Sequence, residues 1–375
     1  MEKSYKFRLY PNREQESLIQ RTFGCCRFVY NHFLGRRKEM YEACKETLGY
    51  TACSTQLTQL KQEPDYVWLQ EVDSTSLQSS LKALDTAYRN MFRRVKNEKK
   101  PGFPKFKSKK SNRNSYQSKC VNKNIAVLDK HVRLPKLGLV RCAVSRSVEG
   151  RVLSATVSQV PSGKYFVSIL CTEVEVMQHP STGAALGLDL GLHDFAVDSN
   201  FCRYPNPKFL AQAQKTLARA QRRLSRKTIG SANREKARVK VALLHEHIAN
   251  QRRDMLQKLS SQLVREYDVL CVENMQVQRM QKQRHLARAI QDAAWAKFYR
   301  MLAYKCQWQH KNLVKVDKCF PSIMPCSECG FKNEIFGNDY QMKWNCHSCG
   351  YVLDVDFNAA QYILKEGLRL LLSAS

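Results

Sequence analysis

Four cysteines near the end of the printed sequence are spaced as the ligands of one metal ion. They form two C-x2-C pairs, Cys326 with Cys329 and Cys346 with Cys349, separated by a spacer of zinc-ribbon length. Zinc takes four thiolates in a closed tetrahedron, so His347, which lies inside the second pair, is not needed as a ligand. The spacing predicts one structural Zn²⁺ site in this segment.

Three acidic residues stand where apolar strands are expected to end or a helix to begin. Asp189 and Glu273 each close a short apolar run, and Asp356 lies at the start of a helical pattern. Carboxylate oxygens hold hard divalent cations such as Mg²⁺ or Mn²⁺. Such ions can activate water for phosphodiester hydrolysis, so the three acids are candidate catalytic metal ligands. Asp354 is the second candidate for the third metal ligand, after Asp356. Its alternative role is to cap the helix.

The charge of the chain points to a polyanionic partner. Among 375 residues, Lys and Arg number 62 against 33 for Asp and Glu, a formal net charge of +29. Nucleic acid is the expected partner for such an excess. No apolar stretch is long enough to span a bilayer, and the first residues lack a secretory apolar core. An odd number of cysteines in apolar segments suits a reducing compartment. We expect a cytoplasmic protein, associated with the nucleoid in a prokaryote.

The elements around the acids follow the order of an RNase H-like fold: a β-hairpin, helices, a strand, a helix, a strand and a final helix. The expected strands span 185–191, 193–198, 269–273 and 313–316, and the expected helices span 212–227, 232–267 and 295–307, with the last one starting near residue 356. In that arrangement the acids of the two apolar strands and of the last helix converge. The fold class expected for the whole chain is multidomain α+β.

The front half combines helices with short strands. Residues 3–10 read as a strand and 12–97 as helical, and five short β-like runs follow at 125–128, 132–134, 139–144, 153–159 and 165–170. Short strands at this spacing indicate a small barrel. Between the two parts, residues 99–114 mix Lys and Arg with Phe and Tyr, which suits a nucleic-acid surface. Lys105, Lys107 and Arg113 are the candidate contacts there.

These residues resemble the RuvC-type nuclease of the TnpB (OrfB) family, transposon-encoded relatives of the type V CRISPR effectors. The resemblance covers nearly the whole chain. Its motifs are Gly187-Leu-Asp189-Leu-Gly191, Val272-Glu273-Asn274, the two cysteine pairs and Asp356-x-Asn358-Ala-Ala, with further matches at 5–11, 24–31, 104–107, 233–236 and 292–295. The offset of Asp356 from Asn358-Ala-Ala matches the family, which favours Asp356 over Asp354 as the third acid.

The resemblance implies an RNA-guided DNA endonuclease. A guide RNA from the transposon end would pair with double-stranded target DNA beside a short adjacent motif, and one RuvC site would cut it with Mg²⁺ or Mn²⁺. The implied domains are a wedge-like β-barrel at 1–10 and 99–180, a helical recognition domain at 11–98, the nuclease at 181–320 and 351–375, and a zinc-ribbon insert at 321–350. Gln78 and Lys82 are implied readers of the adjacent motif, and Arg27, Tyr30 and Asn31 are further candidate nucleic-acid contacts.

Some positions depart from the family pattern. The family commonly carries arginine between the two acids of the last motif, where this chain has Val355. Cys319 replaces a frequent aromatic residue, and Ser322-Ile-Met-Pro325 replaces a usual Ser-Ser or Ser-Thr pair. Two other functions stay open: a guided DNA-binding protein without cleavage, and a transposase that catalyses strand transfer, because an RNase H-like acid triad also serves that chemistry.

Overall fold

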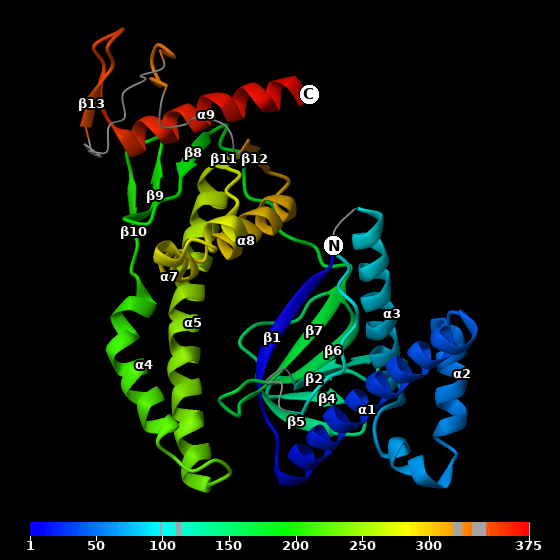
Figure 1. Cartoon of the computed structure of the whole chain (residues 1–375). Coiled ribbons are helices and arrows are strands. Elements are labelled where there is room, and N and C mark those ends of the chain that lie inside the picture. The colour runs from blue at the N-terminus through cyan, green and yellow to red at the C-terminus, as the bar shows by residue number, and fades with distance from the viewer. Residues whose placement is uncertain (98–99, 110–113, 318–324, 332–342, 375) are drawn as a thin grey trace. The chain divides into compact units, whose positions relative to one another are not determined.

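The computed structural model describes residues 1–97, 100–109, 114–317, 325–331 and 343–374 (Figure 1). The chain divides into two compact units, Met1–Glu175 and Val176–Ser375. Each unit buries hydrophobic residues of its own. The division falls close to the predicted boundary at 180–181.

The helices of the first unit begin at recognisable capping residues. Asn12 accepts a hydrogen bond from the Gln15 amide, and the Gln15 side chain accepts one from the Asn12 amide, so α1 (Arg13–Cys44) starts with a capping box. Asp73 caps α3 (Ser74–Lys96) in the same sense through the Thr75 amide. Between them lie α2 (Tyr50–Leu60) and the 3₁₀ helix η1 (Pro64–Glu71). The helical character predicted for 12–97 is confirmed.

The strands of the first unit form one antiparallel sheet in the order β2-β6-β7-β1-β5-β4-β3. They are β1 (Lys3–Tyr10), β2 (Asn114–Lys119), β3 (Ala126–Val127), β4 (His131–Leu134), β5 (Gly138–Ala143), β6 (Arg151–Gln159) and β7 (Tyr165–Thr172). The predicted barrel is therefore an open sheet in the described residues, with β2 and β3 at its edges. The short β3 strand offers too few backbone groups to close the sheet onto β2.

The second unit is built on a five-stranded mixed sheet, in the order β10-β9-β8-β11-β12. The strands are β8 (Ala185–Asp189), β9 (Asp194–Asp198), β10 (Arg203–Pro205), β11 (Val269–Glu273) and β12 (Asn312–Val316). β8, β11 and β12 are parallel neighbours, while β9 and β10 are antiparallel. β10 was not predicted, because its three residues carry no alternating apolar pattern.

Helices cover both faces of this sheet, with α9 on one face and α5 and α8 on the other (Figure 1). The helices of this unit are α4 (Phe209–Ser225), α5 (Ala232–Glu266), α6 (Val277–Met280), α7 (Arg284–Ala293), α8 (Trp295–Trp308) and α9 (Val355–Ala374). On one face Leu186 and Leu188 pack in a cluster with Leu256 of α5 and Phe298 of α8. No helix within the described ranges is both long and apolar enough to cross a membrane.

Two glycines allow α9 to lie directly on the other face. A Cβ atom added to Gly187 of β8 would collide with the carbonyl oxygen of Ala360 in α9. A Cβ atom added to Gly367 of α9 would collide with the Cys271 thiol of β11. Only glycine permits backbones to approach this closely. This close packing determines how near the first turn of α9 lies to the ends of β8 and β11.

Candidate active site and zinc centre

The strands β8 and β11 carry two of the predicted acids to the same end and the same face of the sheet. Because the strands run parallel, Asp189 and Glu273 lie at their neighbouring carboxyl ends. Side chains alternate along a strand, so Asp189 shares the face of Gly187 and Glu273 shares the face of Cys271. Gly187 and Cys271 both lie against α9. The two carboxylates therefore belong to the α9 side of the sheet.

The third acid, Asp356, lies in the first turn of α9 and is close enough to Asp189 for its charge to act on that carboxylate. Burial raises the pKa of Asp189 to about 7, and the charges of Asp356 and Glu273 act in the same direction. Burial also raises the pKa of Glu273. Like charges raise one another's pKa only when they are near neighbours. A divalent cation would relieve this repulsion, so the donor set fits Mg²⁺ or Mn²⁺.

Hydrogen bonding separates the roles of Asp354 and Asp356. Asp354 Oδ1 accepts from the Asp356 amide at 3.0 Å, as a helix cap does, and Asp354 Oδ2 pairs with Arg203 Nη2 at 2.7 Å. Both oxygens of Asp354 are thus engaged. Asp356 has one longer contact, from Oδ2 to Arg203 Nη1 at 3.3 Å. This arrangement favours Asp356 as the residue that is available to a metal ion.

Arg203 is the residue of this site that the sequence did not reveal. It lies on β10 and pairs with Asp194 Oδ2 at 2.7 Å as well as with Asp354 and Asp356. Its guanidinium carbon lies 4.7 Å from the centre of the Phe357 ring. It brings a guanidinium group to the two acids that flank Val355. A lone arginine in a three-residue strand gives no sequence signal for this role.

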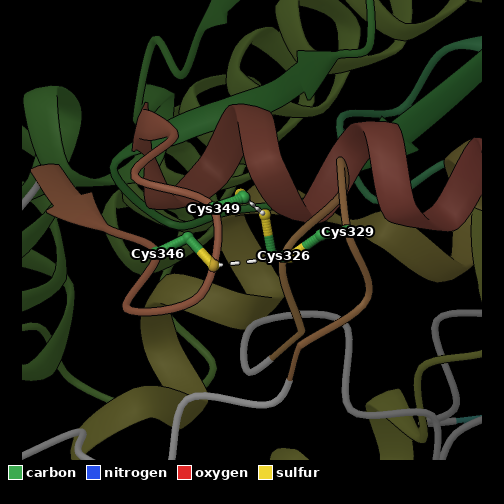
Figure 2. A group of neighbouring side chains, drawn as sticks. All are labelled: Cys326, Cys329, Cys346 and Cys349. Carbon is green, nitrogen blue, oxygen red and sulfur yellow. Dashed lines mark hydrogen bonds between the residues drawn. The ribbon is translucent and has the colours of Figure 1, made fainter.

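The four predicted cysteines come together as one cluster (Figure 2). Cys326 Sγ lies 3.7 Å from Cys349 Sγ, Cys329 Sγ lies 3.5 Å from Cys346 Sγ, and all four sulfurs are within 4.8 Å of one another. A tetrahedron with Zn–S bonds of about 2.3 Å has sulfur–sulfur edges of about 3.8 Å. The cluster therefore has the dimensions of a Zn²⁺ site.

The two cysteine pairs adopt the same backbone turn. In the first, the Gly330 amide donates to Cys326 O and the Cys326 amide to Phe331 O, both at 2.9 Å. In the second, the equivalent bonds join Gly350 to Cys346 and Cys346 to Tyr351, at 2.9 and 2.8 Å. The glycines have φ of 76° and 72°, a conformation that glycine adopts without strain. The repeated turn presents each pair of thiols in the same way.

The amide side chain of Asn358 ties the first cysteine pair to α9. Asn358 Oδ1 accepts from the Ser327 amide at 2.7 Å, and Nδ2 donates to the Pro325 carbonyl at 2.8 Å. Its side chain is fully buried. Ser327 Oγ also donates to Gln361 Oε1 at 2.9 Å. Asn358 thus joins the cysteine cluster to the helical turn that carries Asp356.

Replacing Asn358 with alanine should slow cleavage while the bound zinc is retained. The change leaves the Ser327 amide and the Pro325 carbonyl without their partner, at about 1–3 kcal/mol for each buried group. Asn358→Asp should not rescue the loss, because it would bury a carboxylate against the Pro325 carbonyl. Zinc per chain and the single-turnover rate are the measurements. Gln361→Ala is the control with a small expected effect, and an unchanged rate in Asn358→Ala would contradict the link.

Metal binding at the acids should depend on pH around the pKa of Asp189. Protons and cations compete for this carboxylate, so the apparent Mg²⁺ affinity should rise by about tenfold per pH unit below pH 7 and level off above it. Without metal, the folded state holds a proton that the unfolded state releases near pH 4, so the unfolding free energy should fall as pH rises from about 4 to 7. Calorimetric titration and thermal melting measure these trends. Asp189→Asn should remove both contributions, and a pH-independent affinity would contradict the assignment.

Three residues of the first unit that were predicted to contact nucleic acid contact one another in the structure. Asn31 Nδ2 donates to the Lys107 carbonyl at 2.9 Å, and the Lys107 amide donates to Asn31 Oδ1 at 2.7 Å. The Lys107 ammonium lies 3.9 Å from the centre of the Tyr30 ring, which is itself buried. These contacts hold residues 100–109 against α1, so the three residues have a structural role whether or not they also bind nucleic acid.

The other predicted contacts are more accessible. Gln78 and Lys82 are exposed one turn apart on α3, Lys105 is exposed, and Arg27 on α1 is half-buried. Nucleic-acid binding by these residues stays a prediction. Arg113, Cys319 and Ser322 lie outside the described residues.

Family models match three parts of the chain. A model described as "Probable transposase", for OrfB of IS605, matches residues 169–284, which include Asp189 and Glu273. A Cas12f1-like TNB-domain model matches residues 295–363, which include the cysteine cluster and Asp356. A helix-turn-helix model matches residues 1–46, which form β1 and α1 here.

Relatives match nearly the full length. A Streptomyces pristinaespiralis protein named "Putative RNA-guided DNA endonuclease" is 37% identical over 371 residues, 98% of this chain and 90% of the relative. "Putative RNA-guided DNA endonuclease InsQ" of Escherichia coli K12 is 34% identical over 390 residues, 98% of this chain and 93% of the relative. The chain therefore belongs to the TnpB (OrfB) family of IS605 elements.

A solved structure shares the fold. The chain resembles the protein in a cryo-EM structure of the Cas12f1–sgRNA–target DNA complex, with a TM-score of 0.52 and 12% identity, covering 97% of this chain and 98% of that one. At this identity the likeness concerns the fold. Both chains therefore share a mixed α+β multidomain architecture.

Proposed function

We propose that this protein is an RNA-guided DNA endonuclease whose catalytic metal ligands are Asp189, Glu273 and Asp356. The observation that carries the proposal is the position of the three acids at the ends of β8 and β11 and at the start of α9, where burial and the charges of Asp356 and Glu273 raise the pKa of Asp189. The names of the full-length relatives support the activity. The order of strands and helices in the second unit supports an RNase H-like nuclease.

The residues of the site have distinct roles in this proposal. Asp189, Glu273 and Asp356 supply carboxylate oxygens once they are deprotonated. Arg203 and Asp354 hold the first turn of α9 in place through the ion pair at 2.7 Å and the capping bond at 3.0 Å. The Tyr299 hydroxyl donates to the Glu273 carbonyl at 2.6 Å and fixes the end of β11. Divalent ions, when bound, would supply an activated water and stabilise the leaving oxygen.

Guide RNA and double-stranded target DNA are the proposed partners. The net charge of +29 provides the electrostatic attraction for both. The complex of the fold relative contains an sgRNA and target DNA. Base pairing would read the target sequence, and the first unit would read a short adjacent motif. The predicted division of that unit into a wedge-like domain and a helical recognition domain belongs to this proposal.

The cysteine cluster is proposed to hold one structural Zn²⁺. Small inserts of this kind gain folding energy from thiolate ligation. Asn358 would transmit the position of the zinc centre to the helix turn of Asp356. The zinc ribbon is thus proposed to support the catalytic acids as well as to contact nucleic acid.

A transposase that joins DNA strands is the second candidate, favoured by the description of the OrfB model. The two candidates differ in the RNA they need and in their products. Sequencing the RNA that copurifies with the protein, and separating the DNA products by size, distinguishes them. An endonuclease yields a defined bound RNA and cut ends only. Joined strands formed without RNA would favour the transposase.

A further inference from the structure

The strand register places Arg203 on the same face of the sheet as Asp189. Val197 of β9 pairs with Arg203 of β10 on one side and with Asp189 of β8 on the other. Side chains paired across neighbouring strands point to the same face, which is here the face that α9 covers. Asp356, in the first turn of α9, contacts Arg203 and is close enough to Asp189 for its charge to act there. Asp356 is therefore within reach of both the guanidinium group and the other acids.

Asp356 is the weakest of the three ion-pair partners of Arg203. Arg203 Nη1 lies 2.7 Å from Asp194 Oδ2, and Nη2 lies 2.7 Å from Asp354 Oδ2. The contact from Nη1 to Asp356 Oδ2 is longer, at 3.3 Å. The side chain of Asp356 is also 35% exposed, against 17% for Asp194 and 16% for Asp354. An incoming cation therefore reaches Asp356 most easily and takes it from Arg203 at the smallest loss.

Release of Asp356 would leave Arg203 in place with a donor to spare. Nη1 donates to both Asp194 and Asp356, so the departure of Asp356 frees part of its hydrogen-bonding capacity. The two ion pairs at 2.7 Å, to Asp194 and Asp354, would still hold the guanidinium group. Guanidinium N–H groups bind phosphate oxygens through strong charge-assisted hydrogen bonds. The freed donor would therefore suit a phosphate oxygen that arrives beside the acids.

We propose that Arg203 changes partner in the reaction: it holds Asp356 in the metal-free protein, and it donates to a phosphate oxygen of the DNA once Asp356 binds a divalent ion. This inference rests on the proposed endonuclease function and adds a residue that contacts the substrate. Without DNA, the charge of Arg203 competes with the metal ion for Asp356. With DNA bound, the same charge stabilises the negative charge that develops on the phosphate. Arg203 thus lowers metal affinity in the resting protein and raises the cleavage rate.

Metal affinity in the absence of DNA tests the first half of the exchange. Mn²⁺ is titrated into the full chain with its copurifying RNA and followed by electron paramagnetic resonance, and the binding that Asp189→Ala removes is assigned to the acids. Arg203→Gln should bind this Mn²⁺ about three- to tenfold more tightly, because no positive charge competes for Asp356. Arg203→Lys keeps the charge and should stay close to the unaltered protein. The control Arg226→Gln removes an exposed cation at the far end of α4 and should leave the affinity unchanged.

Single-turnover cleavage at saturating metal tests the second half. Arg203→Gln should cut about 10²–10³-fold more slowly, the loss typical of one donor at a developing charge, and Arg203→Lys should recover part of the rate. Tighter metal binding with slower cleavage separates the exchange from a purely structural role, in which both would fall together.

The outcomes that contradict the exchange differ from those that contradict the endonuclease. Equal or weaker Mn²⁺ binding in Arg203→Gln, tighter binding in Arg203→Lys, or an unchanged cleavage rate in Arg203→Gln would overturn the exchange alone. If the unaltered protein showed no Mn²⁺ binding that depends on Asp189, the endonuclease proposal itself would be wrong.

Discussion

Asp356→Ala should lower the rate of DNA cleavage by about 10³-fold or more, because ligands that act as a unit on shared metal ions lose most of the rate singly. Asp189→Ala and Glu273→Ala should do the same. DNA binding should stay nearly intact, since the +29 charge of the chain supplies it. Single-turnover cleavage and filter binding of the same protein–RNA complex are the measurements.

Asp354→Asn is the matched control for this loss. Asparagine keeps an oxygen that can accept from the Asp356 amide. It loses the charged oxygen Oδ2, which pairs with Arg203 Nη2 at 2.7 Å. A charge-assisted hydrogen bond of this kind contributes about 1.5–3 kcal/mol, and the amide group that would face Arg203 cannot accept it, so we expect a rate loss of about 10–100-fold, smaller than that of Asp356→Ala. If Asp354→Asn abolished cleavage while Asp356→Ala cut normally, the third ligand would be Asp354.

Cys346→Ser should remove the zinc ion and with it the support of the α9 start. One zinc per chain is expected in the unaltered protein. Structural zinc contributes about 10–16 kcal/mol of apparent binding free energy in zinc-finger peptides. We therefore expect protease sensitivity in the cysteine segment and a large loss of cleavage. Metal analysis, limited proteolysis and cleavage assays check these outcomes.

His347→Ala is the control for the zinc centre. His347 is exposed between the two cysteines of the second pair, and the four sulfurs already complete a tetrahedron. This variant should keep the full zinc content and the protease resistance of the segment. Loss of zinc in His347→Ala, or well-folded protein without zinc, would contradict the four-cysteine site.

The sequence revealed the elements whose patterns are local. β11 ends at Glu273 as predicted, because an apolar run is closed by a charge. α5 starts at Ala232 as predicted, where Ser231 caps it through the Arg234 amide, and it ends at Glu266, one residue before the predicted end. The cysteine spacing predicted the cluster that the structure forms. In each case residues close in the chain determine the outcome.

Features that depend on contacts between distant segments were not visible in the sequence. β10 is too short for a pattern, and Arg203 acquires its role only when β10 lies beside the start of α9. The choice between Asp354 and Asp356 rested on a motif offset, whereas the structure shows which carboxylate is already engaged. A closed barrel was predicted, but the described strands form an open sheet, because the spacing of strands along the chain does not determine whether a sheet closes.

The most direct test of the account is whether the RNA selects the DNA that is cut. The guide portion of the copurifying RNA is replaced by an unrelated sequence, and a matching DNA is offered beside the same adjacent motif. The account predicts that cleavage moves to the new DNA, requires Mg²⁺ or Mn²⁺ and disappears without RNA. Cutting that stays at the original sequence, or proceeds equally well without RNA, would contradict it.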